Sequence, residues 1–199
     1  EFILALMDRF FSDEDHPERL ALFPVCRGRG IDVGCGHRKT HPQAIGVDLT
    51  PGGEKGKVGN VSGRTSIADI AGSGDHLWMF SDNELDYVVQ RHNLEHYKDF
   101  LLALQEWKRV LKPGGILGMV IPDEEECDTL RLDSTHYHVF TMRSLQRAID
   151  LIGGFHTCHM GKLLKRWSFV SILQKADSTG SNETAAFDYL RAVRDFEVE

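Results

Sequence analysis

The stretch Gly28 to Asp48, GRGIDVGCGHRKTHPQAIGVD, has the pattern of a strand, a glycine turn, a short connection and a second strand that ends in an acid. Ile31 and Val33 are β-prone and lead into glycines, which let the backbone bend tightly and approach a ligand closely. In an open α/β sheet, an acid at the carboxyl end of the second strand can bind the hydroxyl groups of a ribose. The stretch therefore favours a site for a nucleoside-containing cofactor.

The glycine spacing separates two kinds of nucleoside cofactor. A dinucleotide site requires G-x-G-x-x-G, whereas Gly34-x-Gly36 is followed by His37, Arg38 and Lys39. The run Asp32-x-Gly34-x-Gly36 instead resembles the cofactor loop of class I S-adenosylmethionine-dependent methyltransferases, in which the glycines lie along the methionine portion. A plain tight turn in a buried α/β core is the other interpretation of so short a motif.

The composition of the 199 residues is that of one globular domain, with 41% hydrophobic and 27% charged residues. A net charge of -7 argues against a general binder of nucleic acid or anionic membranes. The four cysteines form no C-x-x-C pair, which indicates free thiols in a reducing compartment, so we expect a cytoplasmic protein. We interpret the opening EFILALMDRFF as an amphipathic helix rather than a signal peptide.

Strands and helices are expected to alternate along the chain, which indicates a largely parallel sheet. The expected strands beyond the opening stretch span 66–70, 85–90, 116–121, 155–163 and 167–174, and the expected helices span 2–11, 17–23, 75–80, 98–111, 141–152 and 183–196. Pro42 and several glycines shorten the connections after the first two strands, so we expect loops there. The amino-terminal helices or a partner subunit would then cover that face of the sheet.

A longer resemblance lies downstream of the glycine loop. EWKRVLKPGGILGMVIPD resembles the helix, turn and fifth strand of the class I methyltransferase family, in its small-molecule, type 11-like branch. FSDNELDYVV is similar to the start of the fourth strand, and LEH to the start of the helix after it. With the glycine loop, Asp48 and Asp69, the similarity follows the family order from Gly28 to Asp123. It implies a Rossmann-like α/β fold, mostly parallel with a terminal antiparallel strand, and S-adenosylmethionine as cofactor.

The resemblance also suggests a domain organisation. Residues 1–27 are expected to form an amino-terminal helical cover, residues 28–176 the methyltransferase domain, and residues 183–199 a carboxyl-terminal helix, all in one structural domain. The apolar stripe on the last helix can dock on the domain or pair with a second subunit, so a homodimer is one open arrangement.

The cofactor site is expected around the ends of the first three strands. Asp48 is assigned to the ribose, and Asp69 to the adenine amino group, although Asp69 can instead cap the following turn. The full set expected to bind the cofactor is Asp32, Gly34, Cys35, Gly36, Asp48, Leu49, Asp69, Ile70 and Arg91.

Methyl transfer from a sulfonium needs in-line positioning and, for a protonated acceptor, a base. Ligands of open α/β sheets bind at the carboxyl ends of the strands, which points to His92 and His96. His136 lies in a later segment that is expected to fold over the same end, and these three histidines are the expected catalytic residues. We therefore expect O-methyl transfer to a small-molecule acceptor with a histidine as general base.

The run His92-x-x-Glu95-His96 also predicts a divalent metal as an alternative. It is similar to the E-x-x-E-H run that, with one further His, holds a metal in some O-methyltransferases, with His92 in place of the first Glu. The candidate ligands are His92, Glu95, His96 and His136, with His138 as the alternative to His136, a set that would suit Zn, Fe or Ni better than Mg. Without a metal, His96 packs at the helix start and His92 or His136 acts as an unassisted base.

Three other functions remain open. An NAD-dependent oxidoreductase is disfavoured by the missing third glycine, and a peptidase matching H-x-x-E-H would need a different structural context. A non-catalytic module that keeps the fold for binding or dimerisation is favoured by the shortened connections. The identity of the acceptor does not follow from the fold.

Overall fold

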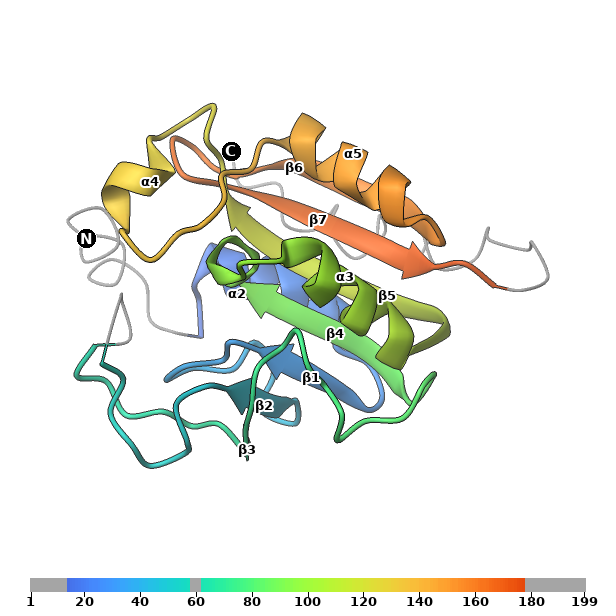
Figure 1. The fold of residues 1–199 in the computed structure, drawn as a ribbon, viewed down its shortest axis with the longest axis horizontal. Coiled ribbons are helices and arrows are strands. Elements are labelled where there is room, and N and C mark those ends of the chain that lie inside the picture. The colour runs from blue at the N-terminus through green and yellow to red at the C-terminus, as the bar shows by residue number, and fades with distance from the viewer. Residues whose placement is uncertain (1–13, 58–61, 178–199) are drawn as a thin grey trace.

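The computed structural model describes residues 14–57 and 62–177, arranged around one seven-stranded sheet of order β3-β2-β1-β4-β5-β7-β6 (Figure 1). Its strands are β1 (Gly30–Val33), β2 (Ile45–Asp48), β3 (Ile70–Ala71), β4 (Leu85–Arg91), β5 (Leu111–Pro122), β6 (Phe155–Leu164) and β7 (Ser168–Lys175). The first five are parallel, and β7 runs antiparallel to both β5 and β6. The expected fold class, with its terminal antiparallel pair, is confirmed. The helices expected over 2–11 and 183–196 lie outside the described residues.

The central strands are buried because both of their faces carry apolar side chains. All four residues of β1 are buried, and the β1–β4 register places Ile31 beside Val88. One face of the sheet packs Ile31, Val33 and Val88 into the larger core cluster, and the other face packs Tyr87 and Val89 into a smaller one. This arrangement holds the ends of the parallel strands in fixed positions, where side chains of the next loops can meet.

Two long helices cover the first face, in front of the sheet in Figure 1. Helix α3 (Phe100–Val110) begins at Asp99, whose side chain accepts a hydrogen bond from the Leu102 N–H at 3.0 Å. Helix α5 (Met142–Ile152) begins at Thr141 with a capping box. The short helix α4 (Thr129–Leu132) begins at Asp128 in a segment where no helix was expected. None of the described helices is long and apolar enough to cross a membrane.

The other face is packed by the amino-terminal helix α2 (Pro17–Leu22) and the 3-10 helix η1 (Phe23–Val25), behind the sheet in Figure 1. Residues 34–44, between β1 and β2, contain no helix, as expected. The described residues between β2 and β3, 49–57 and 62–69, contain none either. With these crossover helices missing, Leu22 lies fully buried against the sheet.

Three expected elements differ from the structure. The strand expected over 66–70 is wrong, because the Asp69 N–H bonds to Gly46 and pairing with Val47 begins only at Ile70. Residues 75–80, expected to form one helical turn, form separate hydrogen-bonded turns. The segment 112–115, expected to be the turn between the helix and the fifth strand, belongs to β5, and the register of β5 with β4 shifts there.

Candidate functional site

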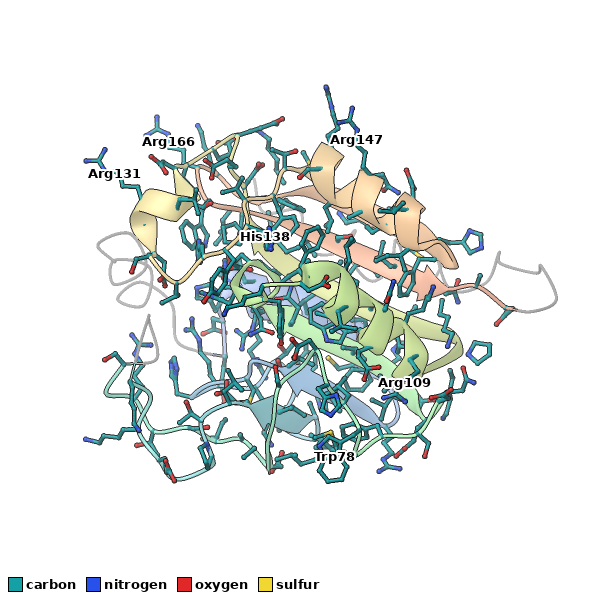
Figure 2. All side chains as sticks on the ribbon, in the orientation of Figure 1. Trp78, Arg109, Arg131, His138, Arg147 and Arg166 are labelled. Carbon is teal, nitrogen blue, oxygen red and sulfur yellow. The ribbon has the colours of Figure 1, made fainter. Side chains whose placement is uncertain are left out.

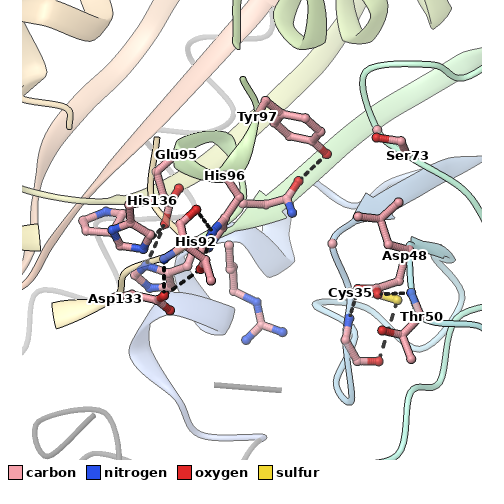
Figure 3. A pocket seen from close by; sticks show the side chains of 18 of the residues that line it. Cys35, Asp48, Thr50, Ser73, His92, Glu95, His96, Tyr97, Asp133 and His136 are labelled. Carbon is pink, nitrogen blue, oxygen red and sulfur yellow. Dashed lines mark hydrogen bonds and ion pairs between the residues drawn. The ribbon is translucent and has the colours of Figure 1, made fainter. Parts of the chain in front are cut away.

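A cavity of about 690 Å³ opens at the carboxyl ends of the parallel strands. This volume lies within the range of roughly 300–1,000 Å³ that is typical of ligand pockets. One end of the cavity is the glycine turn after β1, with Cys35, Asp48 and Thr50 (Figure 3). The other end holds His92 and Glu95, on the segment that follows β4. All the site residues predicted from the sequence therefore line one cavity, except Asp69, Ile70 and the alternative ligand His138.

The glycine turn depends on backbone that other residues rarely adopt. Gly34 has a φ of +67°, and a Cβ atom there would lie 2.2 Å from the Asn93 side-chain nitrogen. The Asp48 carboxylate accepts hydrogen bonds from the N–H groups of Gly36 and Thr50, each at 2.8 Å. Asp48 therefore braces the turn as well as lining the cavity, and the exposed Leu49 follows it.

Two charged groups lie beneath and beside the turn. Asp32 is 1% exposed and accepts a hydrogen bond from the Thr40 N–H. Burial raises the pKa of this carboxyl, and the charge of Arg91 with the Thr40 hydrogen bond offsets only part of the shift. Arg91, at the end of β4, donates to the Arg38 carbonyl at 2.9 Å and lines the cavity with it. Asp32, Cys35 and Arg91 are thus all at the expected end.

Asp69 and Ile70 are not among the residues that line the cavity. Asp69 precedes β3, where it pairs with Lys39 and accepts from the Gly46 N–H at 2.7 Å. The Lys39 hydrogen bond lowers the pKa of Asp69. The carboxylate that follows β3 and does line the cavity is Asp75, which accepts from the Ser73 hydroxyl. The Gly-Ser-Gly run just before Asp75 is typical of a turn. The strand expected over 66–70 instead pointed to Asp69 as the carboxylate at its end.

The other end of the cavity is a cluster of three metal-binding side chains. Glu95 and His96 belong to the 3-10 helix η3 (Leu94–His96), and His136 lies in the loop after α4. One ligand atom from each lies within 4.8 Å of the other two. Glu95 is 1% exposed, and neither of its oxygens accepts a hydrogen bond from a described residue. A buried carboxylate without hydrogen bonds is costly, so this donor set fits a cation.

The two histidines of the cluster are oriented as metal ligands would be. His96 Nδ1 lies 3.2 Å from the carbonyl oxygen of Thr135, a bond that leaves Nε2 available as the donor atom. His136 Nε2 lies 3.9 Å from Glu95 Oε1. Burial lowers the pKa of His136, and the charge of Glu95 offsets only part of that shift. The neutral imidazole that results is the form that binds a metal or accepts a proton.

His92 lies beside this cluster but faces a residue that sequence analysis missed. Its Nε2 lies 2.9 Å from Oε1 of Glu18, on α2, and its Nδ1 lies 3.9 Å from Oε1 of Glu95. Burial lowers the pKa of His92, but the charges of Glu18 and Glu95 outweigh it, so the pKa is raised. Nothing in the letters PERLAL indicated that Glu18 would be buried, because only the tertiary fold brings α2 against the end of β4.

Glu18 makes the free energy of unfolding depend on pH in the acid range. Burial raises the pKa of Glu18. The charge and hydrogen bond of His92, the hydrogen bond of Ser168 and the charge of His16 outweigh burial and hold the pKa at about 2, below the ordinary 4.5. A lowered pKa means that the stabilisation is complete above the unfolded-state value and is lost as the pH falls through the folded-state value.

We therefore expect the unfolding free energy of the wild type to exceed that of Glu18→Gln by on the order of 3 kcal/mol near neutral pH. This difference should shrink steadily between roughly pH 5 and pH 2, the interval between the two pKa values. Urea titrations of both proteins across this range measure it. A difference that does not change with pH would contradict the assignment of Glu18 as a buried carboxylate.

Comparison with known proteins adds independent findings. The methyltransferase domain family matches residues 31–119. A demethylmenaquinone methyltransferase of Staphylococcus carnosus is 35% identical over 74 residues, which are 37% of this chain and 30% of that protein. The Staphylococcus haemolyticus enzyme of the same name is 34% identical over 104 residues, 45% of this chain and 41% of that protein. The chain thus matches less than half the length of these curated relatives.

Solved structures share the fold over most of the chain. A Haloferax volcanii methyltransferase, solved in complex with the Trm112 methyltransferase activator, has a TM-score of 0.64 at 18% identity and covers 89% of this chain and 95% of its own. An S-adenosylmethionine-dependent methyltransferase of Thermotoga maritima has a TM-score of 0.61 at 20% identity, covering 88% and 94%. At these identities the likeness concerns the fold alone.

Proposed function

We propose that this chain transfers a methyl group from S-adenosylmethionine to an oxygen of a small-molecule acceptor, because the methyltransferase domain family matches residues 31–119. The observation that carries the proposal is the single cavity that joins the glycine turn to the Glu95 cluster. A cofactor at one end and an acceptor at the other would meet within it, and such positioning is most of what methyl transfer requires.

We assign the cofactor to the glycine-turn end. The turn at Gly34 and Gly36 would take the methionine portion, and Asp48 the ribose. Asp75 replaces Asp69 as our candidate for the adenine amino group, because Asp75 lines the cavity after β3. Arg91 lines the cavity near the turn, where a cationic group suits the carboxylate of the methionine portion.

We assign a divalent cation to Glu95, His96 and His136, with His92 as a fourth donor through Nδ1. The Glu95 carboxylate, which accepts no hydrogen bond from a described residue, and the bond between His96 Nδ1 and the Thr135 carbonyl support this set. Its imidazole content favours Zn or Fe over Mg. Such a cation would polarise the acceptor oxygen and lower the pKa of its hydroxyl group. Without a cation, the neutral His136 beside Glu95 is our candidate for the general base.

The acceptor itself is proposed only as a class. The family match ends at residue 119, so it includes His92, Glu95 and His96 but not the loop that carries His136. We therefore do not transfer the substrate in the relatives' name to this chain. The four cysteines are free thiols in the structure, which favours a reducing compartment such as the cytoplasm. A Trm112-type activator, as in the Haloferax volcanii complex, and a homodimer are the assemblies worth testing.

Calorimetry tests the cofactor assignment directly. We expect S-adenosylmethionine and S-adenosylhomocysteine to bind with dissociation constants in the micromolar range and NAD not to bind. The absence of heat from the first two ligands at high micromolar concentration would overturn the methyltransferase proposal, and binding of NAD would favour the oxidoreductase.

Asp48→Ala provides a test of the site within the same assay. The substitution removes the proposed ribose contact and both backbone hydrogen bonds that brace the turn. We expect about a 10- to 100-fold weaker affinity for S-adenosylmethionine, the effect of losing charge-assisted hydrogen bonds. Asp150→Ala, on the exposed side of α5, is the matched control and should bind as the wild type does. Equal affinity of the wild type and Asp48→Ala would place the cofactor elsewhere.

Elemental analysis tests the cation. Protein purified without a His tag should contain close to one equivalent of a transition metal or bind one on addition. Metal-free protein with full methyltransferase activity would reject the cation and leave the histidine base as the mechanism.

A further inference from the structure

We propose that Glu18, on the amino-terminal helix α2, is the positioning residue that holds His92 with Nδ1 directed at Glu95. This inference rests on the proposed cation site, in which His92 is the fourth donor. It assigns to α2 a role in the chemistry of the acceptor end, beyond covering the sheet. Neither the family match, which begins at residue 31, nor any sequence motif includes Glu18.

The first observation is the direction of the His92 ring. Glu18 Oε1 lies 2.9 Å from His92 Nε2, and the Glu18 side chain is only 3% exposed. A carboxylate can only accept, so Nε2 must carry the proton of this hydrogen bond. Nδ1 is then the ring nitrogen that can act as a ligand, and it is buried without a hydrogen-bond partner among the described residues. It lies 3.9 Å from the same Glu95 oxygen that His136 approaches.

The second observation is that the pair is held by the start of β7 and by the backbone conformation of His92 itself. Ser168, at the start of β7, donates from its hydroxyl to Glu18 Oε1 at 2.7 Å. The Trp167 ring packs against the His92 ring with centroids 5.2 Å apart. His92 itself has a φ of +52°, which is unfavourable for a residue with a side chain and persists only where the surroundings impose it. These contacts leave the ring little freedom to turn away from Glu95.

The hydrogen bond from His92 to Glu18 is of the kind that metal-binding histidines usually make. A ligating histidine commonly donates its other N–H to a carboxylate, which fixes the tautomer and orientation of the ring. Glu18 occupies that position for His92, as Thr135 does for His96. Helix α2 and the acceptor end are therefore coupled through one buried hydrogen bond.

The test is metal binding by the full chain, measured by competition with a chromophoric chelator for Zn²⁺. We expect Glu18→Gln to weaken Zn²⁺ binding by about 10- to 100-fold, the usual effect of losing such a partner. Glu14→Gln makes the same chemical change at an exposed position of the same segment and should bind Zn²⁺ as the wild type does. The unfolding temperature of each metal-free variant shows whether α2 remains packed.

A double-mutant cycle with His92→Gln separates positioning from general structural damage. If Glu18 acts through His92, adding Glu18→Gln to His92→Gln should weaken Zn²⁺ binding no further. In addition, the Co²⁺-loaded wild type should show three imidazole ligands by X-ray absorption and the His92→Gln variant two.

The outcomes distinguish this inference from the proposed function. A wild type that binds no Zn²⁺ or Co²⁺ would remove the cation site and this inference with it, while binding of S-adenosylmethionine would still stand. A wild type that binds metal with an affinity unchanged in Glu18→Gln would overturn the role of Glu18 alone. Additive effects in the cycle would also overturn it, since Glu18 would then act independently of His92.

Discussion

Replacing Glu95 with glutamine is expected to lower the affinity for a divalent cation by more than about 100-fold, because it removes the charged ligand of the cluster. Glu95 contributes the carboxylate that both His92 and His136 approach at 3.9 Å. A neutral amide is a poor ligand and cannot balance the charge of the metal. Methyl transfer should fall with metal occupancy if the cation activates the acceptor.

The same substitution should make the metal-free protein more stable, by about 1–2 kcal/mol. The Glu95 carboxyl group is buried and its two oxygens have no hydrogen bonds from described residues, whereas an amide costs less to bury than a carboxylate. His92 keeps Glu18 as its counter-charge, so no cation is left unpaired. Loss of metal together with a gain in stability is the pattern expected of a functional group that the fold holds at a cost.

Urea unfolding in the presence of a chelator, with the Zn²⁺ competition assay alongside, measures both effects. Glu125→Gln, at an exposed acid near the same end of the molecule, is the control and should change neither quantity. A Glu95→Gln variant that loses stability and keeps its metal would show that Glu95 is a structural carboxylate, and the cation site would have to be abandoned.

Gly34→Ala is expected to abolish binding of S-adenosylmethionine at micromolar concentrations. The alanine Cβ would lie 2.2 Å from the Asn93 side-chain nitrogen, at a backbone φ of +67°. The Asn93 side chain cannot simply move aside, because its Oδ1 accepts a hydrogen bond from the Tyr97 hydroxyl at 2.6 Å. The turn must therefore shift, and the shift would displace Gly36 from the Asp48 carboxylate that braces it.

Gly53→Ala is the control that separates the effect of the Gly34→Ala clash from the effect of backbone strain. Gly53 has a φ of +85°, but a Cβ there would meet no atom within 4 Å, and the residue does not line the cavity. It should cost about 1–2 kcal/mol of stability, the strain of a left-handed alanine, with no change in cofactor affinity. Calorimetry and thermal unfolding of both variants measure the comparison. If Gly34→Ala bound the cofactor as tightly as Gly53→Ala does, the glycine turn would not be the cofactor site.

Much of the fold was predictable because its signals are local. The β-prone run at 85–90, the amphipathic helix over 98–111 and the glycine turn after β1 each follow from the letters of one segment, and the structure places an element at each. Asp69 shows where such reasoning fails. The run SIADI is apolar enough for a strand, yet its backbone is already bonded to Gly36 and Gly46, so β3 forms only at Ile70–Ala71. Backbone hydrogen bonds to residues that are distant in the sequence cannot be predicted from the residues of one short segment.

The candidate site also has features that local sequence predicts and features that depend on the tertiary structure. The sequence by itself determined the Rossmann-like order, the glycine turn with Asp48, and the spacing that places His92, Glu95 and His96 after one strand. Only the tertiary structure decided that His136 rather than His138 joins Glu95 and His96, that Asp75 rather than Asp69 lines the cavity, and that Glu18 holds His92. The physical reason is that local spacing sets which side chains follow a strand, whereas burial and pairing depend on segments that meet only when the sheet and its covering helices have packed.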